Sequence, residues 1–198
     1  MNRSDACSVS RRALVAVVAG TGFLAGCLDD EGDDGTNADD GSGSENGGEA
    51  LELVDHPSDE PIDPPEGYNC PVCNMQPNDW QDWDAQLVHG EDGATFFDSP
   101  GCLFAYYADP TDPNHGGPDS EITGAWVSGF ETGELTDAED ATFVLEHDHD
   151  RTTAPMDSPV PFADREDAVA YVEDYDDLSE DDIVGLDAAS GEAEGMYP

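Results

Sequence analysis

Hydrophobic and polar positions in the middle of the chain follow the same order twice. In the first copy, residues 84–89 and 94–97 are rich in strand-forming side chains, and the Gly-containing segment 90–93 lies between them, which predicts a β-hairpin. The sequence Asp-Ser-Pro that follows is typical of a helix start, so we expect a helix over residues 98–107.

The second copy begins with two further strand candidates, residues 142–146 and 160–163, which are separated by a longer loop. A helix is then predicted to start at Asp164. Its apolar positions recur at the helical spacing i, i+3, i+4 and i+7 and form one face: Ala168, Tyr171, Val172 and Tyr175. Two β-β-α units predict an α+β fold, with helices packed on small antiparallel sheets.

The parts of the chain outside this pattern are acidic. Residues 28–66 consist largely of Asp, Glu, Gly and Pro, and we expect a disordered linker because there is little to bury. The folded domain is predicted over residues 67–178. Residues 179–198 are interpreted as an acidic tail, in which Ile183, Val184 and Leu186 are candidates for a docked last strand.

The first 27 residues have the layout of an export signal. Arg11 and Arg12 precede an uncharged stretch, residues 13–25, which is too short to span a bilayer. The arginine pair resembles a twin-arginine signal, and the sequence Leu-Ala-Gly-Cys ending at Cys27 resembles a lipobox. We therefore expect a lipid on Cys27 and a location on the outer face of the cell membrane; the alternative is a short anchor helix with an incidental cysteine.

The formal net charge of −43, with five Arg and no Lys, excludes nucleic acid as a partner because nothing is available to neutralise phosphates. Such a charge destabilises a compact state at low ionic strength. At 1 M salt the Debye length falls to about 3 Å and this repulsion is screened. The charge therefore indicates a protein of an extreme halophile, whereas intrinsic disorder would not explain the aromatic-rich centre.

Three cysteines remain once the signal is removed and Cys27 carries lipid: Cys70, Cys73 and Cys102. An odd number in an oxidising compartment leaves at least one thiol unpaired, and metal binding is one reason to retain such thiols.

The pair Cys70 and Cys73 forms a CxxC motif, which is compatible with half of a zinc site, a redox dithiol or a soft-metal site. Met75 follows two positions later, so in an extended backbone its thioether and the Cys73 sulfur point to the same side. Thiolate and thioether are soft ligands that suit Cu(I). The alternative is that Met75 is ordinary core packing.

Further ligand candidates lie elsewhere in the chain. Cys102 is predicted in the first helical turn, where the helix dipole favours a thiolate, although it is equally compatible with a small buried apolar residue. Met156 is predicted in a loop, an unusual position for one of only four methionines. His147 and His149 would share one side of a strand that continues from residue 145, but their acidic surroundings also suit a solvated hairpin.

The sequence contains no recognisable catalytic motif or phosphate-binding loop, so we expect a protein that is not an enzyme. The order of its motifs resembles the NosL family of nitrous oxide reductase accessory lipoproteins. The resemblance extends from residue 69 to about residue 178 and rests on short segments: CPVCNM at 70–75, WDAQL at 83–87, FFD at 96–98, FAYY at 104–107, AWV at 125–127, PM at 155–156, PFA at 161–163 and EDA at 166–168.

The resemblance implies a fold also seen in organomercurial lyase and a membrane-tethered carrier that supplies Cu(I) to the copper-sulfide centre of nitrous oxide reductase. It implies Cys73 and Met75 as copper ligands, usually with a further ligand. We expect Cys70, Cys102, Met156 or a histidine to complete the site. The family's Cys-Gly-Met is here Cys73, Asn74 and Met75, and Asn tolerates a left-handed backbone better than most residues.

Two alternatives from other classes remain open. One is a structural zinc site made of Cys70, Cys73, Cys102 and a histidine. The other is a thiol-disulfide reductase that uses Cys70 and Cys73.

Overall fold

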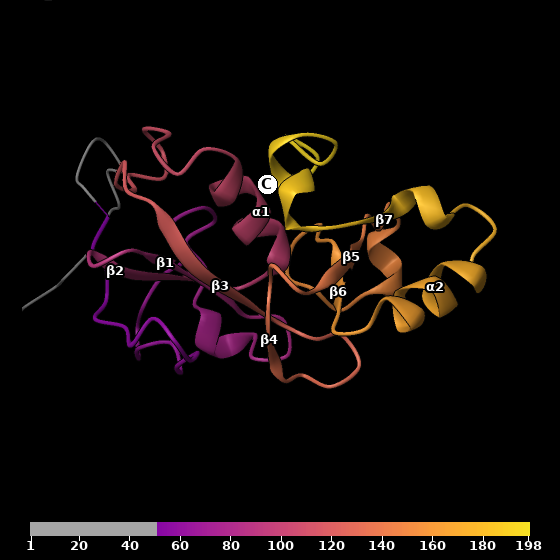
Figure 1. Cartoon of the computed structure of the whole chain (residues 1–198), viewed down its shortest axis with the longest axis horizontal. Helices are drawn as coiled ribbons and strands as arrows, with labels where there is room; N and C mark the ends of the chain where they lie inside the picture. The colour runs from indigo at the N-terminus through magenta and orange to yellow at the C-terminus, as the bar shows by residue number, and fades with distance from the viewer. Residues whose placement is uncertain (1–50) are drawn as a thin grey trace, which may run out of the picture. The chain divides into compact units, whose positions relative to one another are not determined.

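The computed structural model describes residues 51–198 (Figure 1). This part of the chain contains two α-helices, seven strands and four short 3-10 helices. In chain order they are η1 Pro77–Asp79, β1 Ala85–His89, β2 Gly93–Phe97, α1 Pro100–Ala108, β3 Ile122–Ser128, β4 Leu135–Asp137, β5 Thr142–Val144, η2 His149–Arg151, β6 Val160–Phe162, α2 Arg165–Glu173, η3 Glu180–Asp182, β7 Ile183–Val184 and η4 Leu186–Ser190.

The larger sheet is antiparallel and has the strand order β2-β1-β3-β4. Every residue of β1 and β2 is buried, so both faces of this hairpin are covered. On one face, Leu87 and Phe97 pack with the side chains of α1 in the main core cluster. On the other face, Phe96 packs with Val54 and Tyr68. The hairpin therefore forms the central layer of this half of the molecule.

The smaller sheet is also antiparallel, with the order β6-β5-β7. Helix α2 packs against β5 and β6, and its apolar face joins a second core cluster through Ala168 and Val172. The two sheets are connected through the main core, because Phe143 of β5 packs edge-to-face against Phe104 of α1 with ring centroids 4.9 Å apart.

The architecture confirms the predicted α+β class and both β-β-α units. The strand and helix signals of the two copies correspond to β1, β2 and α1 and to β5, β6 and α2. Strands β3 and β4 are additional: they extend the first sheet beyond the predicted hairpin, with β3 pairing directly with β1.

The packed part of the chain is longer at both ends than the predicted domain, residues 67–178. At the N-terminal end, Val54 pairs with Ala94 beside β2, and the amide of Gln86 hydrogen-bonds the backbone of Ile62 in both directions. Residues 51–66 are therefore not a linker throughout, because their few apolar side chains cover one face of the sheet.

The C-terminal segment is likewise part of the fold. The predicted docked strand is present as β7, which pairs with β5. Beyond it, four buried side chains of residues 186–197 join the main core next to α1: Leu186, Ala189, Ala193 and Tyr197. The acidic residues between them face solvent, which is why composition alone indicates a tail.

The predicted signal and the lipid-bearing Cys27 lie outside the described residues. Within residues 51–198, no helix is both long and apolar enough to cross a membrane.

Candidate metal centre

The CxxC motif lies in a tight turn that precedes η1. The Asn74 amide donates to the Cys70 carbonyl over 2.9 Å, and the Cys70 amide donates to the Met75 carbonyl over 2.8 Å. Asn74 closes the turn with φ of 66°, in the left-handed region. The expected tolerance of Asn for this conformation is confirmed. The backbone here is not extended, however, so the argument that placed Cys73 and Met75 on one side by strand periodicity is wrong.

The start of α1 supplies the third cysteine. Ser99 is the N-cap, and its side chain accepts a hydrogen bond from the Cys102 amide over 3.3 Å, which places Cys102 in the first turn as predicted. Gly101 donates its amide to Ser158 Oγ over 2.8 Å, and a Cβ at this position would collide with the carbonyl oxygen of Asp157. Glycine at this position lets the loop that carries Met156 approach the helix next to Cys102.

These elements bring four ligand groups together, namely the sulfurs of Cys70, Cys73 and Cys102 and a carboxylate oxygen of Asp98. All four atoms lie within 4.8 Å of one another. We call this group the cysteine cluster. Cys70, Cys102 and Asp98 are buried, whereas Cys73 is half-buried and gives the cluster its contact with solvent.

Asp98 is the member of the cluster that the sequence analysis did not predict as a ligand. It follows the last residue of β2, and its Oδ1 lies 2.8 Å from the Cys73 sulfur, within hydrogen-bonding distance. Its other oxygen, Oδ2, is buried and has no hydrogen-bond partner among the described residues. A buried carboxylate oxygen without a partner is costly, and a cation would satisfy it. The sequence feature that could have identified Asp98 as a ligand is its position between a predicted strand and the helix turn that carries Cys102.

The surroundings of the three thiols give them different pKa values. Hydrogen bonds from the thiols of Cys102 and Cys70 hold the pKa of Cys73 well below its usual range. The same hydrogen bonds, together with burial, raise the pKa of Cys102, and burial raises the pKa of Cys70. In the metal-free cluster these hydrogen bonds favour the thiolate at Cys73 over Cys102, where the helix dipole alone would favour it. Burial and the hydrogen bond with Cys73 raise the pKa of Asp98 to about 6.

The two candidate methionines belong to segments next to the cysteines, and the four groups of the cluster are cysteines and a carboxylate alone. Met75 is half-buried, two residues after Cys73. Met156 is also half-buried, in the loop whose next two residues contact Gly101. Both thioethers thus belong to segments that border the cysteines.

No histidine belongs to the cysteine cluster among the described residues, so the fourth group of a Cys3His zinc site is replaced by Asp98. The predicted strand through His147 and His149 is also absent, because β5 ends at Val144 and His149 begins η2. The remaining histidines have protein partners: His56 bonds Gln86, His89 bonds Tyr106 and His115 bonds the Asp109 carbonyl.

Fold and cluster together define a small α+β protein with a buried, thiol-rich candidate metal centre. The family model of NosL matches residues 61–177, more than half of the sequence. The chain belongs to the NosL family.

Comparison with solved structures gives a match to the crystal structure of the copper chaperone NosL from Shewanella denitrificans. The TM-score is 0.48 at 16% sequence identity, and the match covers 65% of this chain and 93% of that chain. No curated protein matches this sequence.

Proposed function

We propose that this chain is a Cu(I) chaperone, a carrier and not an enzyme, that binds the ion through Cys73 and Met75 and passes it to a recipient protein. The observation that carries the proposal is the cysteine cluster, in which three sulfurs and one carboxylate lie within 4.8 Å in a member of the NosL family. Soft sulfur ligands select Cu(I), and the partly accessible Cys73 suits an ion that must leave again.

The choice of Cys73 follows from its surroundings. It is the cysteine with a lowered pKa, and the thiolate is the form that binds metal. It is also the cysteine nearest to solvent. Met75 supplies a thioether from the same turn, and Cys70, Cys102 or Met156 completes the coordination.

The test is competition for Cu(I) against a chromophoric chelator, with reduced, lipid-free protein in molar salt. We expect Cys73→Ser and Met75→Leu each to weaken Cu(I) binding by about tenfold or more, a change of about 1.4 kcal/mol. Met75→Leu keeps an apolar side chain of similar size, so unchanged affinity in this variant would refute the thioether ligand.

A structural zinc site is the second candidate, and Asp98 is the observation that favours it. Zinc accepts thiolates together with a carboxylate, whereas Cu(I) has little use for a hard oxygen ligand. Under the copper proposal, Asp98→Asn leaves Cu(I) affinity within a fewfold of wild type, while a zinc site loses Zn(II) affinity strongly. Tight Zn(II) binding that depends on Asp98 would replace our proposal with the structural site.

The same protein sample tests the thiol-disulfide reductase. A reductase turns over a disulfide substrate, and this turnover disappears in Cys70→Ser because the resolving thiol is lost. The copper carrier shows no such turnover.

The proposal extends to delivery and location. We propose that nitrous oxide reductase apoprotein receives the copper. We also propose that lipid on Cys27 tethers the chain to the outer face of the cell membrane after twin-arginine export. The supporting observations are the family and the Leu-Ala-Gly-Cys motif. Cu(I)-loaded protein should metallate the apo-reductase, and a reductase that stays without copper would refute the proposed delivery. Cys27→Ser should release the chain from membranes, and a variant that stays membrane-bound would refute the lipid tether.

A further inference from the structure

The loop that carries Met156 is held next to elements that bear the cysteine cluster. We call residues 147–158 the Met156 loop. Trp83, which precedes β1, donates its Nε1–H to Thr153 Oγ1 over 3.0 Å, and the Gly101 amide of α1 donates to Ser158 Oγ over 2.8 Å. Only four residues lie between these two contacts, so Met156 stays close to the first turn of α1 while both of them hold.

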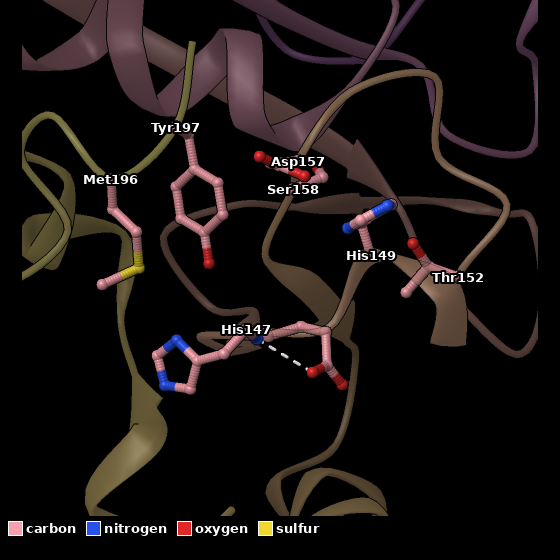
Figure 2. A pocket seen from close by; sticks show the side chains of 8 residues that line it. His147, His149, Thr152, Asp157, Ser158, Met196 and Tyr197 are labelled. Atoms are coloured by element: carbon pink, nitrogen blue, oxygen red, sulfur yellow. Dashed lines mark hydrogen bonds between the residues drawn. The ribbon is translucent and has the colours of Figure 1, made fainter.

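Hydrophobic packing does little to fix this loop. Residues 147–157 are all exposed or half-buried. One flank of the loop borders a pocket of about 190 Å³, whose walls include Thr152, Asp157 and Ser158 of the loop and Tyr197 of the C-terminal segment (Figure 2). A segment with few buried apolar contacts opens easily unless polar contacts hold it.

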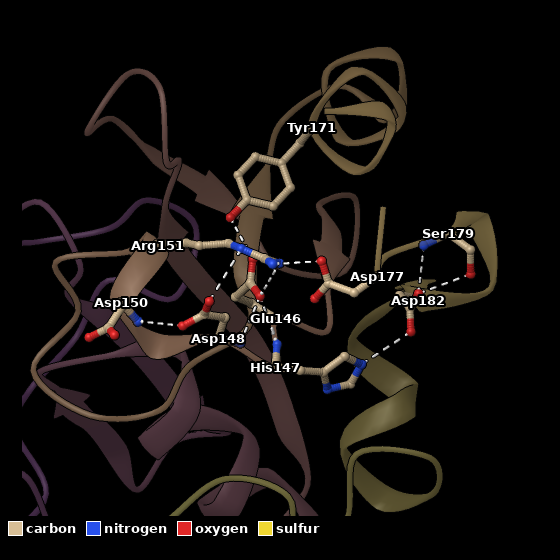
Figure 3. A network of polar contacts seen from close by, with 9 residues as sticks. All are labelled: Glu146, His147, Asp148, Asp150, Arg151, Tyr171, Asp177, Ser179 and Asp182. Atoms are coloured by element: carbon tan, nitrogen blue, oxygen red, sulfur yellow. Dashed lines mark hydrogen bonds and ion pairs between the residues drawn. The ribbon is translucent and has the colours of Figure 1, made fainter. Parts of the chain in front are cut away.

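Arg151 supplies such contacts near the start of the loop, in η2 (Figure 3). Its Nη1 lies 3.1 Å from Glu146 Oε1, its Nη2 lies 2.6 Å from Asp177 Oδ1, and its Nε lies 3.7 Å from Asp148 Oδ2. The guanidinium carbon also lies 4.3 Å from the centre of the Tyr175 ring. Arg151 thus ties the start of the loop both to the end of β5 and to the segment after α2.

Glu146 gives this network a rigid centre. Its side chain is only 2% exposed, and it accepts a hydrogen bond from the Tyr171 hydroxyl over 2.7 Å. The amides of His147 and Asp148 donate to the same carboxylate, each over 2.8 Å. A buried carboxylate that satisfies several donors at once has little freedom to move, so Arg151 is anchored on a fixed group.

The network also suits molar salt. Arg151 and Arg165 are the two cationic side chains, histidines apart, of residues 51–198. The Arg165 side chain is 57% exposed and 3.8 Å from Glu180, so salt screens this pair. Screening acts much less on the pair of Arg151 and the buried Glu146. The arginine whose contacts persist in molar salt is therefore the one that holds the Met156 loop.

We infer that Arg151 is a positioning residue for the proposed copper site. It fixes the start of the Met156 loop on Glu146, and the contacts of Thr153 and Ser158 fix the rest. The Met156 thioether is thereby presented beside the first turn of α1 as the further ligand of the ion. A ligand on a fixed loop binds more tightly than one that must be ordered first. The inference rests on the proposed function.

The experiment is a double-mutant cycle for Cu(I) affinity, measured by chelator competition in molar sodium sulfate, because chloride itself ligates Cu(I). We expect Arg151→Gln to weaken Cu(I) binding by about tenfold. In the Met156→Leu background the same change should alter the affinity by less than about twofold, because no thioether remains to be positioned. Arg165→Gln changes the net charge equally and is the matched control; it should leave the affinity unchanged in both backgrounds.

A milder variant accompanies Arg151→Gln, which leaves the buried carboxylate of Glu146 without its cation and destabilises the fold. Asp177→Asn removes a charge from the exposed end of the network and keeps the pair of Arg151 and Glu146. It should weaken Cu(I) binding less than Arg151→Gln does, and again only where Met156 is present. Circular dichroism establishes that each variant is folded under the assay conditions.

The inference and the proposed function fail differently. An equal effect of Arg151→Gln with and without Met156→Leu would overturn the inference, because the network would then act on the fold in general. Unchanged affinity in either single variant, with Cu(I) binding still dependent on Cys73, would also overturn it and leave the proposed function intact. Cu(I) binding that is unaffected by Cys73→Ser would refute the proposed function itself.

Discussion

At the scale of single residues, the turn at Asn74 determines how the cysteines are presented. A left-handed residue between Cys73 and Met75 reverses the chain, so that the Cys70 amide meets the Met75 carbonyl. Only glycine and, to a lesser degree, asparagine or aspartate adopt this conformation without appreciable strain.

Replacement of Asn74 tests this requirement. Asn74→Val should destabilise the protein by about 1 to 3 kcal/mol because a β-branched residue is strained at positive φ, and it should weaken metal binding by misplacing Cys73. Asn74→Gly is the matched control and should be close to neutral, since glycine adopts φ of 66° freely. Urea unfolding in molar salt, with chelator competition for Cu(I), measures both. Equal stabilities for the Val and Gly variants would refute the strain argument.

The residue scale also shows what the sequence could and could not predict at the site. Cys70, Cys73 and Cys102 were recognisable because cysteines are few and their motifs are local. Asp98 was not, since it is one of 48 acidic residues and only the packing of β2 against the 70–75 turn distinguishes it. The strand through His147 and His149 failed for the opposite reason: alternation suggested it, but Glu146 instead binds the amides of His147 and Asp148 and ends the extended run.

At the scale of elements, the periodic pattern of apolar residues predicted those strands and helices that the local sequence determines. The hairpin of β1 and β2 and the apolar face of α2 follow from alternation and helical spacing. The segments at both ends of the fold contain too few apolar residues for a periodic signal. Val54, Ile62, Leu186 and Tyr197 are buried or half-buried because long-range contacts select them from acidic surroundings.

The C-terminal segment provides the prediction at this scale. Leu186→Ala should destabilise the protein by about 2 to 5 kcal/mol, because a side chain with only 4% exposure in the main core leaves a cavity beside α1. Asp187→Ala, an exposed neighbour, should change the free energy of unfolding by less than about 0.5 kcal/mol. Thermal and urea unfolding measure both variants. If Leu186→Ala behaves like Asp187→Ala, the segment is a dispensable tail.

At the scale of the whole molecule, charge is the dominant feature. A formal net charge of −43 includes only five arginines that could offset it locally. Within the described residues Arg151 contacts Glu146, Asp148 and Asp177, and Arg165 lies 3.8 Å from Glu180. Most carboxylates therefore repel one another without a cationic partner.

Salt dependence follows from this charge. The free energy of unfolding should rise steeply from about 0.05 M to about 1 M salt and then more slowly, because the Debye length shortens from about 14 Å to about 3 Å over this range. Equimolar sucrose, which is excluded from protein surfaces but does not screen charge, should stabilise the protein much less at low concentrations. Urea unfolding at several concentrations of potassium chloride provides the measurement. Equal stability at both ends of the range would contradict the halophilic interpretation.

The half-buried position of Cys73 also determines how a metal can leave the cysteine cluster. Asp98, Cys70 and Cys102 are buried, so Cys73 is the member of the cluster that an incoming donor atom can approach from solvent. We therefore expect exchange to occur by direct attack of a recipient's ligand at Cys73. A slender donor such as a single imidazole side chain should extract the metal faster than a bulky chelator of much higher affinity, so the rate of release depends on the shape of the acceptor and not on its binding strength.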